Sequence, residues 1–245
     1  MREFDLILVG ATGFTGRLVA EHIATVYGFD AAPRWAIAGR SIDRLEQVRV
    51  QLGAGEGQLP CIVADSLDDR AMIELAGRTR VVCSTVGPYA RYGRPLVSAC
   101  AGCGTHYCDL SGEVPWMADM ILRHQDRAEA SGARLVHSCG FDSVPSDLGT
   151  WFVQQAMMRE HGVPAGRVRG RVGRTRGAAS GGTVASLLGV LEDAGRDRRV
   201  RRIARDPYAL YPPGVEPGVD GADRLGAHFD TAFDQWTGPF VMASI

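Results

Sequence analysis

Short apolar runs alternate with longer amphipathic stretches along the first part of the chain. The apolar runs are typical of buried strands, and the stretches between them carry apolar residues at helical spacing. The predicted strands are 5–9, 34–38, 59–64, 80–85, 106–110 and 133–138, and the predicted helices are 14–27, 42–52, 68–77, 92–103 and 115–131. Such alternation predicts a parallel sheet with right-handed crossovers. We therefore expect an α/β, Rossmann-type doubly wound domain over residues 1–143.

The pattern changes in the second part of the chain. A helical stretch at 146–160 is followed at 166–172 by arginine alternating with valine or glycine, a period of two that is typical of a half-exposed strand. A further helical run covers 184–204, and the Pro- and Gly-rich stretch 206–221 is expected to be a loop. The chain then ends in an apolar run. We expect residues 144–245 to form a second, α+β substrate domain that is truncated at its C-terminus.

Composition is that of an ordinary globular protein, and it excludes several functions. The 245 residues are 45% hydrophobic and 22% charged, with a formal net charge of −1. A chain so close to neutrality gives no electrostatic reason to expect nucleic acid as a partner. All 27 basic residues are arginine, which excludes a Tyr-x-x-x-Lys pair, a Schiff-base lysine and a Walker lysine.

We expect neither a targeting segment nor a metal site. The chain begins almost directly with its first strand, which leaves no room for a signal peptide, and no apolar run reaches the length of a membrane span. A cytoplasmic protein with reduced thiols is therefore expected. Cys100 and Cys103, with Cys108 nearby, have a spacing found in metal sites, but a second such pair is missing and Cys100 lies within a helical pattern.

A glycine-rich turn joins the first predicted strand to the first helix. It has the spacing G-x-x-G-x-x-G, with a threonine where the standard fingerprint has its second glycine. Glycines permit a tight bend and a close backbone approach, and the helix presents unpaired N–H groups and its positive dipole end to a pyrophosphate. The turn predicts a dinucleotide site, with an ordinary strand–helix turn as the alternative. The residues assigned to this site are Gly10, Thr12, Gly13, Phe14, Thr15 and Gly16.

The second strand indicates which dinucleotide binds. It ends at Arg40, where an NAD site has an acidic residue for the ribose hydroxyl. A guanidinium suits the 2′-phosphate of NADP, which a carboxylate would repel. We predict NADP(H) as the cofactor, with Arg40 on the 2′-phosphate, Ser41 as a hydrogen-bond donor and Arg44 as support. Asp65 and Gly87, which follow the third and fourth strands, complete the predicted cofactor set.

Polar residues at the later strand ends are the candidates for catalysis. Tyr89 follows the turn after the fourth strand, and Asp109 and Glu113 follow the fifth. Because the carboxyl ends of parallel strands meet at one edge of a sheet, these side chains are expected near the substrate. Simpler interpretations are a packing role for Tyr89 and a helix-capping role for Asp109. We predict Tyr89, Asp109 and Glu113 as the catalytic set.

Two further features are compatible with anion binding. Residues 180–183, Ser-Gly-Gly-Thr, stand at a predicted helix start near Arg174 and Arg176, which fits either an acidic substrate group or a plain N-cap. Arginines within 196–205 form a basic cluster interleaved with aspartates. The cluster fits a solvated helix face, or a docking surface for an acidic carrier protein or an anionic lipid.

Together these motifs resemble those of the saccharopine dehydrogenase-like oxidoreductases, and most closely the actinobacterial trans-acting enoyl reductases of lipid and polyketide assembly. The similarity extends over most of the chain and is therefore more specific than the glycine turn alone. Members of this family are longer than this chain, which agrees with its abrupt apolar end. The matching segments are residues 10–16, 38–41, 85–89, 109–113, 139–147 and 180–183.

The resemblance implies an NADPH-dependent oxidoreductase that reduces an enoyl, or α,β-unsaturated acyl, intermediate. Hydride would reach the β-carbon, a donor near residues 87–89 or 109–113 would stabilise the enolate, and Tyr89 is the candidate proton donor. Two alternatives stay open: a saccharopine-type reductase of an amino-acid adduct, and a non-catalytic NADP(H)-binding module that senses redox state or supports an assembly. The expected partners are an acyl substrate on a carrier or synthase and, through peripheral association, the membrane surface.

Overall fold

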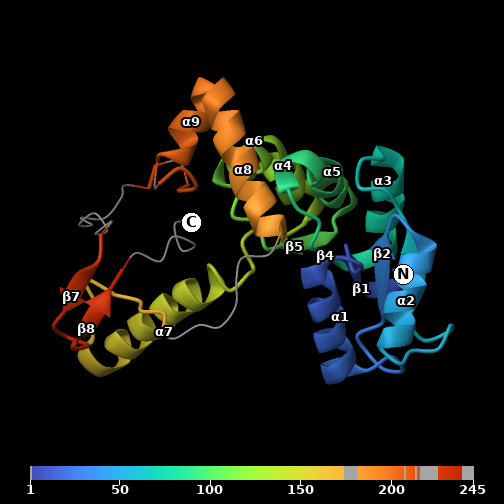
Figure 1. Cartoon of the computed structure of the whole chain (residues 1–245), viewed down its shortest axis with the longest axis horizontal. Helices are drawn as coiled ribbons and strands as arrows, with labels where there is room; N and C mark the ends of the chain where they lie inside the picture. Colours follow the sequence, from blue (N-terminus) through green and yellow to red (C-terminus); the bar gives the residue numbers. More distant parts are fainter. Residues whose placement is uncertain (1, 174–180, 207, 213, 216–225, 239–245) are drawn as a thin grey trace.

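A parallel sheet of six strands forms the core of the first part of the chain (Figure 1). The computed structural model describes residues 2–173, 181–206, 208–212, 214–215 and 226–238. The strand order is β3-β2-β1-β4-β5-β6, so the direction of winding reverses between β1 and β4. This is the predicted Rossmann-type, doubly wound order. The strands are β1 (Phe4–Val9), β2 (Trp35–Gly39), β3 (Cys61–Val63), β4 (Thr79–Ser84), β5 (His106–Asp109) and β6 (Leu135–Val136).

Helices cover both faces of this sheet. On one face, residues of α1 and α2 pack against β1 and β2 in one apolar cluster. On the other face, residues of α3, α5 and α6 pack against β1, β4 and β5 in a second cluster. The predicted helix 92–103 corresponds to α5, and a short helix that was not predicted, α4, precedes it. The helices are α1 (Phe14–Tyr27), α2 (Ile42–Gln51), α3 (Asp69–Arg78), α4 (Tyr89–Tyr92), α5 (Arg94–Cys103) and α6 (Val114–Ser131).

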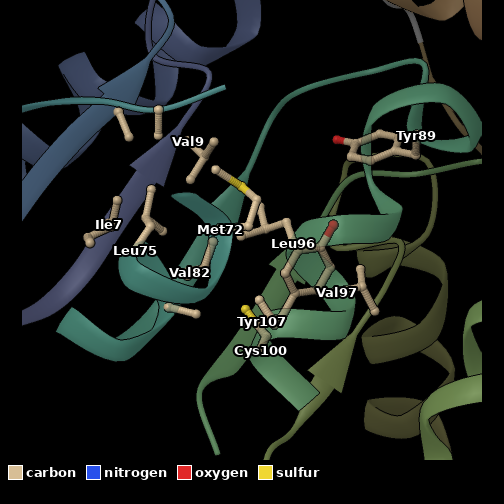
Figure 2. Close-up of a cluster of buried hydrophobic side chains, with 14 of the residues drawn as sticks. Ile7, Val9, Met72, Leu75, Val82, Tyr89, Leu96, Val97, Cys100 and Tyr107 are labelled. Atoms are coloured by element: carbon tan, nitrogen blue, oxygen red, sulfur yellow. The ribbon is translucent and has the colours of Figure 1, made fainter. Parts of the chain in front are cut away.

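The central strand contributes to both clusters because its side chains alternate between the two faces. Ile7 and Val9 lie in the cluster with α3 and α5, whereas Leu8 lies in the cluster with α1 and α2. Figure 2 shows Ile7 and Val9 beside Met72 and Leu75 of α3. Burial on both faces explains why these strands are continuous apolar runs in the sequence.

Local capping fixes where the helices begin and end near the strands. The Asp68 carboxylate accepts hydrogen bonds from Arg70 N at 2.9 Å and Ala71 N at 3.1 Å, which starts α3. At the other end of α5, Gly104 adopts φ +65°, a left-handed conformation that suits glycine and ends the helix before β5. These local signals keep the connections short, so the strand ends stay at one edge.

The second part of the chain buries little of its apolar surface. It contains α7 (Val144–His161), α8 (Gly181–Arg196), α9 (Arg198–Ala204) and a hairpin of β7 (His228–Asp230) and β8 (Gln235–Thr237). Figure 1 shows α7 running away from the sheet, while α8 and α9 lie near α4 and α6. Within the described part of 144–238, the buried side chain is Asp230. The helices and hairpin agree with the expected smaller α+β part.

The predicted strand at 166–172 is wrong. Its described backbone is irregular, and the Arg171 guanidinium instead forms an ion pair with Asp230 of the hairpin. An alternating pattern produces a strand only when a neighbouring strand completes the hydrogen-bond ladder, and within the described residues β7 pairs with β8 instead. Half of the predicted loop at 206–221 and nearly all of the terminal apolar run lie outside the described residues.

Candidate cofactor site and catalytic edge

The register of the sheet aligns the carboxyl ends of its central strands. Val9, the last residue of β1, pairs with Ala38 of β2 on one side and with Ser84 of β4 on the other. Ser84 in turn pairs with Asp109, the last residue of β5. The loops that follow these four strands therefore start at one level. The strand order reverses between β1 and β4, which is the position where open α/β sheets bind ligands.

The turn after β1 has room only for glycine at its two ends. Gly10 adopts φ +92°, and a Cβ there would lie 2.7 Å from Val86 Cγ2. A Cβ on Gly16 would lie 2.1 Å from the Gly10 carbonyl oxygen. Between them, Gly13 N donates to Gly10 O at 3.0 Å and closes the bend. The backbone therefore curves tightly, and Gly13 within the bend is exposed, as the approach of a pyrophosphate requires.

The first turn of α1 has free backbone donors. Gly13 is the N-cap, and the cap has no side-chain hydrogen bond. The first helical hydrogen bond runs from Arg17 N to Gly13 O at 3.0 Å, so the N–H groups of residues 14–16 have no partner within the described protein. Thr12 and Thr15 are half-buried beside them, and Phe14 is 73% exposed. These groups fit a phosphate, because the unpaired donors and the helix dipole both favour an anion there.

Arg40 follows β2 and carries an exposed guanidinium that has no ion pair with any described residue. Ser41 caps α2, where its Oγ accepts from Arg44 N at 3.5 Å and keeps its own proton to donate. Asp65, after β3, is exposed and accepts from Leu67 N at 3.0 Å, which fixes the turn there. These residues lie along the half of the edge that the adenosine end of a dinucleotide would occupy.

The loop after β4 lies directly against the glycine turn. Thr85 N donates to Val9 O at 2.9 Å, and Thr85 Oγ1 lies 3.2 Å from Gly10 O. Farther along, a Cβ on Gly87 would lie 3.6 Å from the Tyr89 ring and 3.8 Å from Ser186 Oγ of α8. Gly87 is therefore placed between the sheet edge and the second part of the chain.

Tyr89 is a buried residue that connects β4 to the segment after β5. It is 4% exposed, its hydroxyl donates to Ser84 O at 3.1 Å, and it accepts from Leu110 N at 3.4 Å. Desolvation and the nearby Asp109 carboxylate raise the pKa of Tyr89 far above its ordinary value. Its ring belongs to the cluster in Figure 2 and lies 5.4 Å, between centroids, from Trp116. Its packing role is established, and its role as a proton donor stays a prediction.

Glu113 holds three elements together through one buried carboxylate. It is 2% exposed, and it accepts from Tyr89 N at 2.8 Å and Ala90 N at 2.7 Å, the first N–H groups of α4. Its Oε1 also accepts from the Ser186 hydroxyl at 2.6 Å. Glu113 therefore caps α4 from a distant loop and attaches α8 to the sheet edge. A catalytic role for Glu113 stays a prediction.

Asp109 is the centre of a second buried hydrogen-bond network. The residue is 2% exposed. Its Oδ2 accepts from the Tyr107 hydroxyl at 2.9 Å and from His137 Nδ1 at 2.7 Å. Its Oδ1 accepts from Ser111 N at 3.0 Å and Ser138 N at 3.1 Å. With both oxygens in use, Asp109 fixes the geometry of the residues around it, and its catalytic role too stays a prediction.

Sequence reasoning missed two residues of this edge, His137 and Ser186. His137 falls inside the predicted strand 133–138, but β6 ends one residue before it, so the strand-end rule applied with the observed boundary would have selected it. Ser186 lies mid-helix in a distant segment, and no local signal marks its contact with Glu113. Ser180, Arg174 and Arg176 lie outside the described residues, so the second anion site stays a prediction.

The reversed strand order, the glycine turn and the uncapped helix define a Rossmann-type domain that binds a dinucleotide. Residues 6–136, more than half of the chain, match the family model described as the saccharopine dehydrogenase NADP binding domain. The protein belongs to this family and carries an NADP-binding domain. Both the resemblance and the predicted cofactor, NADP(H), are confirmed.

Relatives with high similarity come from mycobacteria. Rv2449c of Mycobacterium tuberculosis, provisionally named a trans-acting enoyl reductase, is 44% identical over 99% of this chain and 58% of its own length. The trans-acting enoyl reductase of Mycobacterium leprae is 39% identical over 99% of this chain and 59% of its own. The chain thus spans a little under three fifths of these relatives.

Comparison with solved structures returns the apo saccharopine dehydrogenase (L-Glu forming) of Saccharomyces cerevisiae. The match covers 64% of this chain and 31% of the yeast chain, with 17% identity and a TM-score of 0.48.

In the part of this chain that the structure describes, no helix combines the length and apolarity needed to cross a membrane.

Proposed function

We propose that the protein is an NADPH-dependent reductase of an enoyl thioester, acting in trans on an intermediate of lipid or polyketide synthesis. The observation that carries this proposal is similarity to trans-acting enoyl reductases along 99% of the chain, at 39–44% identity. The NADP-binding family match supplies the reductant that such a reaction needs. When bound, NADPH would supply the hydride that reduction of the conjugated thioester at its β-carbon requires.

In this proposal the cofactor lies along the aligned strand ends. The free N–H groups at the start of α1 hold the pyrophosphate, while Arg40, with Ser41, binds the 2′-phosphate. Asp65 lies at the adenosine end and Gly87 at the nicotinamide end. The end of the loop from Gly87 to Tyr89 is fixed by Glu113, which accepts from Tyr89 N, and by the Tyr89 hydroxyl, which donates to Ser84 O. The loop therefore offers a rigid wall against which a thioester can be oriented.

We further propose that an acidic carrier protein delivers the acyl group and docks on the basic cluster of α8 and α9. Two of its arginines are used internally: Arg196 pairs with Glu192, and Arg201 donates to Ala194 O at 2.8 Å. The others are exposed and have no ion pair within the described residues, so they are free to meet carboxylates. These exposed arginines are Arg198, Arg199, Arg202 and Arg205. An anionic membrane surface is the competing partner.

The proposal is tested by mixing the protein with NADPH and a series of enoyl thioesters, presented on coenzyme A and on a carrier protein. We expect the NADPH absorbance to fall and mass spectrometry to find the saturated product. With NADPH deuterated at the transferred position, the label should appear on the β-carbon. As a control, the Arg40→Ala variant should react slowly at low NADPH concentration and reach the wild-type rate at high NADPH concentration, because the substitution weakens NADPH binding alone.

Two other outcomes would contradict the proposal. Tight NADPH binding with no oxidation by any thioester, free or carrier-bound, would favour the non-catalytic NADP(H)-binding module. Oxidation by an imine formed from an amino acid, with no reaction of thioesters, would favour a saccharopine-type reductase.

A further inference from the structure

His137 and Asp109 form a hydrogen-bonded pair at the edge of the sheet where β5 and β6 end. The Asp109 side chain is fully buried, and its four hydrogen bonds all use it as an acceptor. His137 Nδ1, 2.7 Å from Asp109 Oδ2, must therefore be the donor in this contact. This contact determines the tautomer of His137. In the neutral ring Nε2 carries no proton, and in the imidazolium Nε2 carries the transferable proton.

The ring of His137 is held in one orientation while its outer nitrogen stays accessible. Tyr107 and Trp116 contact it edge-on, with centroid distances of 5.8 Å and 5.0 Å. The side chain is 9% exposed. Nε2 makes no hydrogen bond within the described residues, and it is not fully buried. Nε2 therefore reaches solvent at the edge where β5 and β6 end.

The tyrosines of this edge are poor sources of a proton by comparison. The Tyr89 hydroxyl donates to Ser84 O, and the Tyr107 hydroxyl donates to Asp109. Burial raises the pKa of both phenols well above the ordinary value. An acid has to release its proton and recover it from water at each turnover, and His137 alone of these three keeps an atom free for that exchange.

We propose that His137 is the general acid of the reaction and that Asp109 is its positioning residue. As hydride adds to the β-carbon, the C=C π pair shifts to join the α-carbon to the carbonyl carbon, and the carbonyl π pair moves onto oxygen, which gives an enolate. His137 Nε2–H then gives its proton to the α-carbon: the enolate C=C pair forms the new C–H bond, the carbonyl re-forms, and the N–H pair stays on the ring nitrogen. The Asp109 carboxylate holds the ring through the Nδ1–H hydrogen bond, and solvent supplies the next proton. This inference rests on the proposed reductase function.

The test compares His137→Gln with His22→Gln, a matched change at an exposed histidine of α1. We expect His137→Gln to lower kcat by about a hundred- to ten-thousandfold with an unchanged Kd for NADPH, and His22→Gln to behave as wild type. The D2O isotope effect should grow in His137→Gln and the effect of deuterated NADPH should shrink, because proton transfer becomes limiting. Asp109→Asn should lower kcat and change both isotope effects in the same directions. A merely structural role would change neither isotope effect.

Three results would overturn the assignment. The first is an unchanged kcat in His137→Gln when the wild type is active. This result would reject His137 as the general acid but not the reductase function. The second is a Tyr89→Phe variant that produces the isotope pattern expected of His137→Gln. The third uses nitrogen NMR of wild type labelled at histidine, which needs no turnover. There, a saturated acyl thioester added with NADP⁺ should shift the His137 Nε2 signal, and no shift would remove His137 from the site even if the reductase function also failed.

Discussion

At the scale of single residues, Gly16 controls the geometry of the cofactor turn. A Cβ at this position would lie 2.1 Å from Gly10 O and 2.9 Å from Ala11 Cα, and both are backbone atoms that cannot rotate away. Gly16→Ala is therefore expected to lower the free energy of unfolding by about 1–3 kcal/mol, as overpacking does, and to weaken NADPH binding. Thermal unfolding and fluorescence titration with NADPH measure the two effects.

Gly77 provides the matched control for this substitution. It lies in α3, and a Cβ there has nothing within 4 Å. Gly77→Ala should raise the free energy of unfolding by about 0.5–1 kcal/mol, through helix propensity, and leave NADPH binding unchanged. Equal behaviour of the two variants would mean that the close approach at Gly16 is not what shapes the turn.

Residues could be predicted from the sequence where one local conformation determines their role. The glycine turn and Arg40 follow from the order strand, turn, helix and from their place at strand ends. The partners of Asp109 and Glu113 could not be predicted, since His137 and Ser186 reach them from segments 28 and 73 residues away. Such contacts depend on how elements pack, which no local pattern encodes.

At the scale of elements, Arg2 joins α3, β4 and α5 next to the amino end of β1. Its Nη1 donates to Ala76 O at 2.6 Å, Thr79 O at 2.8 Å and Thr105 Oγ1 at 2.6 Å, and its Nη2 reaches Cys103 O. Arg2→Ala leaves these buried acceptors without a charged donor. We expect a loss of about 1–3 kcal/mol in the free energy of unfolding, the cost of unsatisfied buried groups, measured by urea denaturation.

The control for Arg2 is an arginine that, among the described residues, forms a single, exposed ion pair. Arg70 pairs with Glu74 one turn along α3, with 88% of the Arg70 side chain exposed. Arg70→Ala should change the free energy of unfolding by less than about 0.5 kcal/mol, as surface pairs do. If Arg2→Ala were equally mild, the three elements would be held by apolar packing alone.

Elements were predictable wherever burial imposes a periodicity. All six sheet strands and the longer helices between them follow from apolar runs and helical spacing, because the two faces of the sheet are buried against helices. The one-turn helix α4 was not predicted. The stretch 166–172 has an equally regular pattern, but no strand lies beside it among the described residues, and its backbone is irregular. An alternating sequence becomes a strand only when the fold places a second strand beside it for hydrogen bonding.

At the scale of the whole molecule, the apolar core belongs to the first part of the chain. Every buried hydrophobic residue in the described structure lies at or before Ala128. We therefore predict that residues 1–143 form an independent NADP-binding domain. A chain ending at Ser143 should unfold cooperatively and bind NADPH within about threefold of the full chain, a difference below about 0.7 kcal/mol. Non-cooperative unfolding, or loss of NADPH binding, would place the boundary elsewhere.

The central claim is that this sheet edge binds NADPH through a contact between Arg40 and the 2′-phosphate. One charge-assisted contact contributes about 1.5–3 kcal/mol, so Arg40→Ala should weaken NADPH binding by roughly ten- to hundredfold. NADH, which lacks the phosphate, should bind almost unchanged. Arg40→Asp should go further, because a carboxylate repels the phosphate and accepts from the ribose hydroxyl.

Dissociation constants for NADPH and NADH on the wild type, Arg40→Ala and Arg40→Asp are the measurement that decides this claim. The account predicts a selective loss of NADPH affinity that is larger in Arg40→Asp. An equal loss for both cofactors would mean that Arg40 supports the fold, and no loss for either would place the 2′-phosphate on another residue, with Arg44 the next candidate.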